Sequence, residues 1–204
     1  MKKLLAMVAV FALLAILAGC SKAPEAEMAA AQASLTAAQT AEAETYAPDA
    51  LRMAQDTLSA ANAAKTEQDG KFALFRSYGA SKEMFVRADA LLKQSAQTAA
   101  TEKEKVRVQV EALLTEAQAV LDSTNAALAK APVGKGNKAD IELIKNDVAG
   151  VGTQFADAQA DYNSGKYMVA KGKVEAVISR ARSLMGEIAA AAQKKRMGTA
   201  PAGN

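Results

Sequence analysis

Hydrophobic residues recur at alternating spacings of three and four in the C-terminal half of the chain, over 141–162 and again over 167–191. They are Ile141, Ile144, Val148, Val151, Phe155, Ala158 and Tyr162, then Tyr167, Ala170, Val174, Val177, Ala181, Leu184, Ile188 and Ala191. This is the heptad pattern of a left-handed helical bundle. Asn163-Ser164-Gly165-Lys166 separates the two stripes, and Gly165 can take the left-handed conformation that closes a helix. The pattern predicts antiparallel helices over 139–163 and 166–195.

A similar turn occurs earlier, where Gln68-Asp69-Gly70-Lys71-Phe72 matches the later turn in form. Polar residues, a glycine and a lysine are followed by an aromatic residue in both. Apolar residues line the predicted helices on either side, over 48–68 and 71–97. They are Leu51, Ala54, Leu58 and Ala61 before the turn, and Phe72, Phe75, Phe85, Ala88, Leu91 and Leu92 after it. We interpret the two hairpins as an internal pseudo-repeat.

From Lys71 to Lys130 the chain has no proline, and its only glycine is Gly79. The apolar stripe resumes as Val106, Val110, Leu113, Ala117, Val120, Thr124 and Ala127. The middle, over 93–105, has little apolar material, which allows either a break or one long helix shared by two bundles. Because this middle is rich in alanine, glutamine, glutamate and lysine, which are good helix formers, the long helix is favoured.

The remaining pieces fit the same plan. An alanine-rich helix is predicted over 25–45, with Met28, Leu35 and Ala38 as its buried face, and Pro48 suits the first turn of the next helix. The chain thus divides into a helical region at 25–130, a loop at 131–139, a second hairpin at 140–196 and a tail at 197–204. The expected fold is all-α, an elongated antiparallel helical bundle or coiled-coil rod, with two three-helix segments sharing one long helix.

The N-terminal segment has a different character. Met1-Lys2-Lys3 precedes an apolar run from Leu4 to Gly19, and a basic start, an apolar segment and small residues at the cut make up a secretory signal. The run is shorter than the roughly 20 residues that span a bilayer. Leu17-Ala18-Gly19-Cys20 resembles the lipobox of bacterial lipoproteins. The alternative is an ordinary signal cleavage site that leaves a free thiol.

The lipobox resemblance implies a signal peptide over 1–19 and a lipidated N-terminus with a short linker over 20–24. In that family the cysteine receives a diacylglycerol, the chain is cut before it, and the new N-terminus is acylated. Ser21 resembles the pattern that directs lipoproteins to the outer membrane, whereas an aspartate there retains them in the inner membrane. The implied location is the bacterial outer membrane, facing the periplasm, with the membrane as a partner through the lipid on Cys20.

Tyr46-Ala47-Pro48-Asp49-Ala50-Leu51, with the Gly-Lys-aromatic turn after it, is similar to the domain-of-unknown-function 4398 family. The resemblance covers roughly residues 25–100. The family's members are bacterial, alanine-rich, helical and frequently lipoproteins, and the family has no established activity. The resemblance therefore supports the location and the fold, and it implies no catalytic residue.

Charge and composition exclude several classes of function. The net charge is +3, of which Lys2 and Lys3 in the leader supply two, so nothing electrostatic suggests nucleic acid. Histidine is absent and Cys20 is the only cysteine, which removes the usual zinc ligands and nucleophile–histidine pairs. We expect no enzyme activity, no metal site and no cofactor.

Three polar segments are interpreted as solvent-exposed structure without a binding role. Glu102 and Glu104 alternate with Lys103 and Lys105 as a solvated helix face. Gly134-Lys135-Gly136-Asn137-Lys138 fails the spacing of a phosphate-binding loop and is interpreted as a flexible basic connection. Lys194, Lys195 and Arg196 suit the C-terminal end of a helix dipole. The functional alternative for these three cations is contact with anionic lipid or cell-wall polymer.

Aromatic residues gather near the predicted helix ends and turns. They are Tyr46, Phe72, Phe75, Tyr78, Phe85, Phe155, Tyr162 and Tyr167. Packing in the core at the bundle ends is the expected role, and a groove for an apolar ligand is the alternative.

The sequence therefore predicts a lipid-anchored envelope protein that acts as a non-enzymatic scaffold or adaptor. The alternative is a binding module for a hydrophobic ligand or cell-wall polymer. An envelope protein or peptidoglycan would be the partner, and the sequence sets no oligomeric state.

Overall fold

The computed structural model describes residues 22–198, with side chains as far as Lys194, and the regular structure in this range is entirely helical. The helices are α2 (Glu25–Thr40), α3 (Ala43–Tyr46), α4 (Pro48–Asp69), the short 3₁₀ helix η1 (Ala73–Phe75), α5 (Gly79–Lys130), α6 (Lys138–Asn163) and α7 (Tyr167–Gly198). The predicted all-α fold is confirmed. Within residues 22–198, no helix is both long enough and apolar enough to cross a membrane.

The chain divides into two compact units whose boundary, between Glu102 and Lys103, lies inside α5. Helix α5 is continuous over 52 residues. The predicted long helix is therefore confirmed, and the alternative of a break within 93–105 is wrong. From Ala100 to Gln109 none of its side chains is fully buried. Good helix formers carry the helix through this stretch without support from a core. The first unit holds α2, α3, α4 and the start of α5, and the second holds the rest of α5 with α6 and α7.

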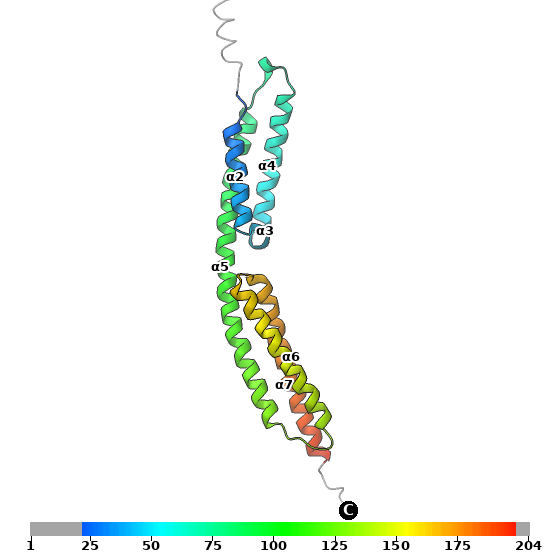
Figure 1. Ribbon diagram of the computed structural model, residues 1–204. Coiled ribbons are helices and arrows are strands. Elements are labelled where there is room, and N and C mark those ends of the chain that lie inside the picture. The colour runs from blue at the N-terminus through cyan, green and yellow to red at the C-terminus, as the bar shows by residue number, and fades with distance from the viewer. Residues whose placement is uncertain (1–21, 199–204) are drawn as a thin grey trace, which may run out of the picture. The chain divides into compact units, whose positions relative to one another are not determined.

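The core of the first unit is built largely from small side chains. In α2, the buried positions are Ala31, Ser34 and Ala38, whereas Met28 and Leu35, predicted to be buried, are half-buried. Small side chains let two helix axes approach closely, so alanine and serine occupy the face that larger residues were expected to fill. Figure 1 shows α2 and α4 beside the N-terminal half of α5.

The predicted helix over 25–45 is interrupted. Helix α2 ends at Thr40, Glu42 takes a left-handed conformation with φ of 58°, and α3 is a single turn that ends at Tyr46. A left-handed non-glycine residue is disfavoured because its Cβ crowds the backbone, so the tight reversal is maintained by packing. Tyr46 and Ala47 are buried there, and Pro48 occupies the first turn of α4 as predicted.

Polar contacts tie α2 to α5. Ser34 Oγ donates a hydrogen bond of 2.5 Å to Asp89 Oδ1, and Lys93 Nζ donates one of 2.8 Å to Asp89 Oδ2. Burial raises the pKa of Asp89, but these two hydrogen bonds outweigh it and leave the pKa below its ordinary value. Nearer the start of α2, Lys82 Nζ lies 3.0 Å from Glu27 Oε1.

The core of the second unit follows the predicted heptads closely. Its buried cluster joins α5, α6 and α7 and comprises Ala117, Leu121, Ile141, Ile144, Val148, Val151, Phe155, Ala158, Val174, Val177, Ile178, Ala181, Leu184, Ile188 and Ala191. Gly165 between α6 and α7 has a φ of 79°, which confirms the predicted left-handed turn. Tyr162 and Tyr167, at the end of the seams, are half-buried.

The loop between α5 and α6 is held by Asn137, which is 1% exposed. Its Nδ2 donates to Pro132 O at 2.8 Å and to Ala191 O of α7 at 3.0 Å, and its Oδ1 accepts from Gly134 N at 2.8 Å. Helix α6 begins at Lys138, within the predicted loop of 131–139. The loop is therefore fixed to the end of α7, where the sequence predicted a flexible connection.

The first hairpin turn differs from the second, contrary to the predicted repeat. Gly70 has a φ of −71° in the right-handed region, and no helix starts at Lys71. Residues 70–78 instead form a loop that contains η1, and α5 begins only at Gly79. Phe72 and Phe75, predicted to line a helix, lie in this loop and are exposed.

Candidate functional site

The predicted site residues fall in different parts of the chain. Cys20 and Ser21 lie outside the described residues. Lys195 and Arg196 belong to the last turn of α7, and Lys194 Nζ lies 2.9 Å from Asp140 Oδ2 near the start of α6. Lys194 also borders a groove of about 430 Å³ that Asp140, Asp147 and Glu187 line. Lys194 thus connects two helices among acidic neighbours, and its charge is offset locally.

The loop over 70–78, here called the aromatic loop, carries the most concentrated group of exposed large apolar side chains among the described residues of the first unit. Phe72 is 70% exposed, Leu74 52% and Phe75 75%. The rings of Phe72 and Phe75 lie 6.3 Å apart between centroids. Single exposed apolar residues are ordinary on protein surfaces, but a contiguous group is typical of an interaction site.

Hydrogen bonds hold the backbone of the aromatic loop in one conformation. Arg76 crosses the loop, with Nε donating to Lys71 O at 2.9 Å and Nη2 donating to Asp69 O at 2.8 Å. Ser77 N donates to Gln68 Oε1 at 3.1 Å, and Phe75 N donates to Phe72 O at 2.9 Å. The apolar side chains are therefore presented to solvent by an ordered loop.

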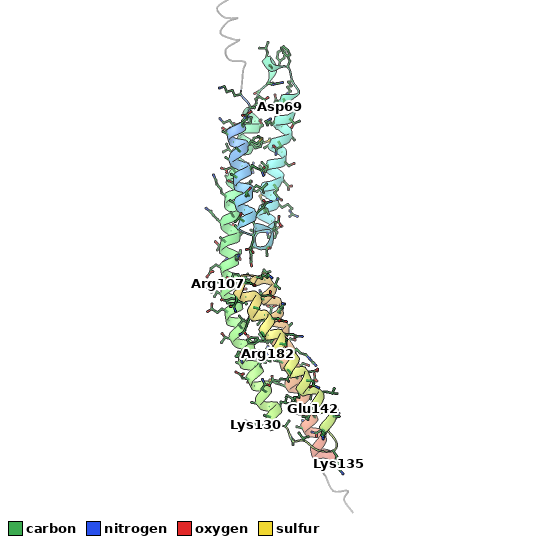
Figure 2. All side chains as sticks on the ribbon, in the orientation of Figure 1. Asp69, Arg107, Lys130, Lys135, Glu142 and Arg182 are labelled. Atoms are coloured by element: carbon green, nitrogen blue, oxygen red, sulfur yellow. The ribbon has the colours of Figure 1, made fainter. Side chains whose placement is uncertain are left out.

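Asp69, at the end of α4 beside the loop (Figure 2), holds the C-terminal end of the loop through Tyr78. Its Oδ1 accepts a hydrogen bond of 2.5 Å from Tyr78 Oη, and its Oδ2 lies 2.7 Å from Lys65 Nζ. The hydrogen bond from Lys65 and that from Tyr78 lower the pKa of Asp69. The same contact, with burial of the phenol, raises the pKa of Tyr78. The ionised carboxylate is thus the form that fits this arrangement.

The aromatic loop lies at the end of the first unit where α2 begins (Figure 1). Lys82, just after the loop, pairs with Glu27 in the first turn of α2. Glu25, the first residue of α2, acts electrostatically on Lys65, the partner of Asp69. The start of α2, the end of α4 and the loop therefore form one surface.

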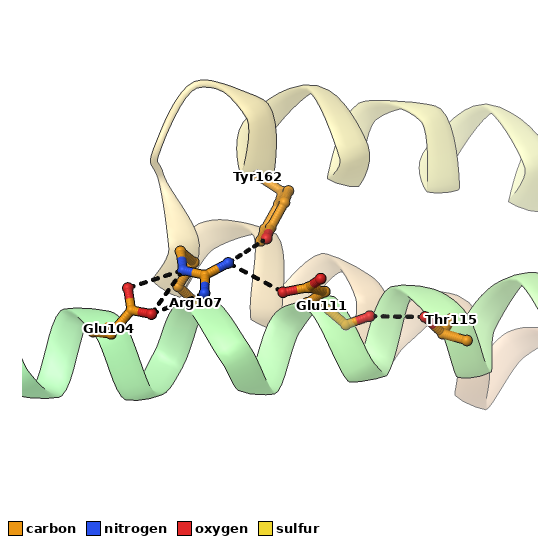
Figure 3. Close-up of polar contacts among 5 residues, drawn as sticks. All are labelled: Glu104, Arg107, Glu111, Thr115 and Tyr162. Atoms are coloured by element: carbon orange, nitrogen blue, oxygen red, sulfur yellow. Dashed lines mark hydrogen bonds and ion pairs between the residues drawn. The ribbon is translucent and has the colours of Figure 1, made fainter.

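A second polar cluster closes the hairpin end of the second unit (Figure 3). Arg107 Nη2 lies 2.8 Å from Glu104 Oε1, and Arg107 Nη1 donates to Glu111 Oε2 at 3.1 Å and to Tyr162 Oη at 3.2 Å. The hydrogen bond to Glu104, followed by that to Tyr162, raises the pKa of Arg107 further above its ordinary range. The cluster fastens α5 to the end of α6.

The aromatic rings beside that cluster contact one another. The rings of Tyr162 and Tyr167 lie 5.4 Å apart between centroids, and Lys103 Nζ lies 5.9 Å from the centroid of Tyr167. These contacts match the expected role of the aromatic residues in packing at the bundle ends. Phe72 and Phe75 are the exceptions, because their side chains are exposed.

The second unit has another open groove, which is larger than the one beside Lys194. It has a volume of about 620 Å³ and runs between the end of α5 and α6. Leu128, Val133 and Ile141 line it, with Glu142 and Lys145 among its polar residues. Its volume is in the range of binding sites for small molecules. The residues that line it do not point to a particular class of ligand. Among the described residues, no group of three or more acidic, histidine or cysteine side chains could hold a metal ion.

The sequence prediction missed the aromatic loop, and helical phase offers a partial signal for its two phenylalanines. The buried positions at the start of α5, together with Tyr78 just before it, are spaced alternately by three and four residues. They are Tyr78, Ser81, Phe85, Ala88, Leu92, Ser95 and Ala99. Continued towards the N-terminus, this alternation reaches Leu74 and Lys71, so Phe72 and Phe75 are out of phase with the buried face. Helical phase thus separates these two rings from the core, but it does not account for Leu74, which is in phase and 52% exposed.

No family model, no curated protein and no solved structure matches this chain.

Proposed function

We propose that the protein is a lipid-anchored scaffold or adaptor of the bacterial cell envelope, attached to the outer membrane through Cys20. The observation that carries the proposal is the lipobox resemblance of Leu17-Ala18-Gly19-Cys20 behind a basic, apolar leader. The lipid on Cys20 attaches the protein to the membrane, and the helices that follow Cys20 in the chain form a folded domain that catalyses no reaction.

The use of side chains in the described helices supports a structural role. The heptad apolar residues of the second unit pack into its core, and its ion pairs join helices to one another. Arg182 Nη2 lies 2.6 Å from Glu116 Oε1, and Lys173 Nζ lies 2.5 Å from Asp161 Oδ2. A body held together in this way suits a protein that presents surfaces to partners.

A binding module is the second candidate, and the groove beside Leu128, Val133 and Ile141 favours it. An apolar molecule of moderate size would contact these side chains. Extraction of the purified protein with organic solvent, followed by mass spectrometry, tests this candidate. Val133 lines the groove and is 52% exposed, so a ligand that is recovered from the wild type and lost in Val133→Glu would favour binding over scaffolding.

Metabolic labelling with a fatty-acid analogue tests the anchor. The wild type should incorporate the label, and intact mass should show a diacylglyceryl group on Cys20 after cleavage of residues 1–19. Cys20→Ala should lose the label and remain uncleaved. A Cys20→Ala protein that still fractionates as a processed lipoprotein would contradict the proposal.

Ser21→Asp tests the outer-membrane location separately. The labelled protein should move to the inner-membrane fraction, while Ser21→Thr should stay with the outer membrane. Labelling should be equal in both variants, so a change in sorting is separated from a change in lipidation. Equal fractionation of the two variants would contradict the sorting role of Ser21.

A further inference from the structure

We infer that the aromatic loop docks on the lipid bilayer beside the lipidated cysteine, with Phe72, Leu74 and Phe75 inserted among the headgroups. The inference deepens the proposed function and rests on it, because the lipid on Cys20 is what brings the bilayer to this end of the first unit. The occupant of the exposed apolar patch is thus the membrane surface itself.

The first step is the order of the loop. Arg76, Ser77 and Tyr78 each hold it through hydrogen bonds to the end of α4 or across the loop. A slack loop could fold its apolar side chains against a neighbouring helix, but this one keeps them in solvent. Exposure of three large apolar side chains is unfavourable in water, and transfer into an apolar environment removes that cost.

The second step is distance along the chain. Only Ser21, Lys22, Ala23 and Pro24 separate Cys20 from the start of α2. A fully extended chain spans at most about 3.6 Å per residue, so the lipid attachment lies within about 18 Å of Glu25. Since α2 begins on the same surface as the aromatic loop, an anchored protein holds this loop close to the bilayer.

The third step is chemistry. The loop contains Lys71 and Arg76 and no acidic residue, but both cations have partners in the protein: Lys71 Nζ lies 2.9 Å from Glu67 Oε1, and Arg76 donates to the backbone of Lys71 and Asp69. The contact therefore rests on the apolar side chains, and aromatic and aliphatic side chains that enter the interface are typical of peripheral membrane contacts. Three apolar residues are too few to hold a protein on a membrane alone, but they suffice to orient one that a lipid already anchors.

The absence of tryptophan from the chain allows a direct test. Phe75→Trp places the chain's only tryptophan in the loop, where its emission can be excited separately from that of the tyrosines, and the 75% exposure of Phe75 makes the change compatible with the fold. Met53→Trp is the matched control, because Met53 is also exposed, at 58%, on α4 of the same unit. It lies sixteen residues before Asp69, or about 24 Å along the helix.

Each full-length lipidated variant is reconstituted into vesicles of phosphatidylethanolamine and phosphatidylglycerol, with and without acyl chains brominated near their carbonyl ends. A side chain in the interface lies about 5–10 Å into the headgroup and acyl boundary. The Phe75→Trp protein should show blue-shifted emission that the brominated lipid quenches strongly. The Met53→Trp protein should show neither effect, and far-ultraviolet circular dichroism verifies the helical fold of both.

Two different results would overturn the inference, and they are distinguishable from a failure of the proposed function. If the mass shows that Phe75→Trp is lipidated but its emission is not quenched, the loop does not contact the bilayer, and the proposed anchor still stands. Equal quenching of both variants shows unspecific adsorption and also overturns it. An unmodified Cys20, seen by mass, overturns the anchor and with it the placement of the loop.

Discussion

Asn137 is a single side chain that fixes a whole connection. It makes three hydrogen bonds to backbone groups from a buried position, one of them to α7. The sequence predicted a flexible basic segment there, because glycine and lysine dominate its composition. A pattern of residue types does not reveal which polar side chain will be buried, since burial depends on where the end of α7 lies.

Asn137→Ala should destabilise the second unit by about 1–3 kcal/mol, because it leaves the backbone partners of a buried amide without hydrogen bonds. Urea unfolding followed by circular dichroism measures the change. Lys135→Ala, in the same loop but exposed, is the control and should leave stability within about 0.5 kcal/mol of the wild type. Equal stability of both variants would contradict the anchoring role.

Asp69 gives the aromatic loop a dependence on pH. Its pKa is lowered in the folded protein by the hydrogen bonds from Lys65 and Tyr78. The stabilisation is therefore present above the unfolded value, about 3.9 for aspartate, and is lost as the pH falls through the lower folded pKa.

Wild type and Asp69→Asn should consequently converge in stability as the solution is acidified. The difference between their free energies of unfolding should be largest near neutral pH and vanish below the folded pKa of Asp69. Other carboxylates, such as Asp161, contribute to acid denaturation of both proteins, and the difference removes their effect. A difference that is constant with pH would contradict the proposed ionisation.

At the scale of elements, the two hairpin turns look alike in sequence and differ in structure. Gly165 requires a left-handed backbone and Gly70 does not. Both turns combine a glycine, a lysine and an aromatic residue, so composition predicted a repeat. The two aromatic residues differ in phase, because Tyr167 continues the buried stripe of α7 whereas Phe72 falls beside the stripe of α5.

Gly165→Ala should therefore destabilise the protein by about 1–2 kcal/mol, the cost of a left-handed conformation with a Cβ. Gly70→Ala should be neutral or stabilise it by up to about 1 kcal/mol, because the backbone there suits alanine and the unfolded chain loses freedom. Its new Cβ would meet Glu67 O at 3.6 Å, an ordinary contact. Thermal unfolding of the matched pair measures both effects, and a larger loss for Gly70→Ala would contradict the assignment.

The helices themselves were largely predictable. The stripes of α6 and α7 identified their buried residues, and the continuous α5 followed from the absence of proline and the presence of good helix formers. The aromatic loop was missed because η1 and the Arg76 hydrogen bonds depend on contacts across the turn. The buried face of α2 was only partly predicted, since small residues can pack more closely than larger ones.

At the scale of the whole molecule, the two units should lose structure separately. Leu184 is fully buried in the second unit, and Leu184→Ala should cost that unit about 2–5 kcal/mol. Hydrogen exchange measured by mass spectrometry should then rise over 110–190 and stay unchanged over 25–95. An equal rise in both ranges would show one cooperative unit.

The elongated shape predicted from the sequence is open to a solution measurement. Small-angle scattering should give a radius of gyration well above the value of about 16 Å for a compact globule of the mature length. A protein expressed from Ser21 onwards, without the leader and the lipid, avoids the contribution of detergent to the scattering. A radius near that of the globule would contradict the rod.

The stretch of α5 over 100–109, whose side chains are not fully buried, can be lengthened without a change in either core. A seven-residue insertion there would lengthen the helix by about 10 Å without adding or removing a core residue in either unit. Seven residues turn through nearly two whole turns, so the buried face would rotate by only about 20°. A variant with such an insertion should therefore keep the packing of both bundles.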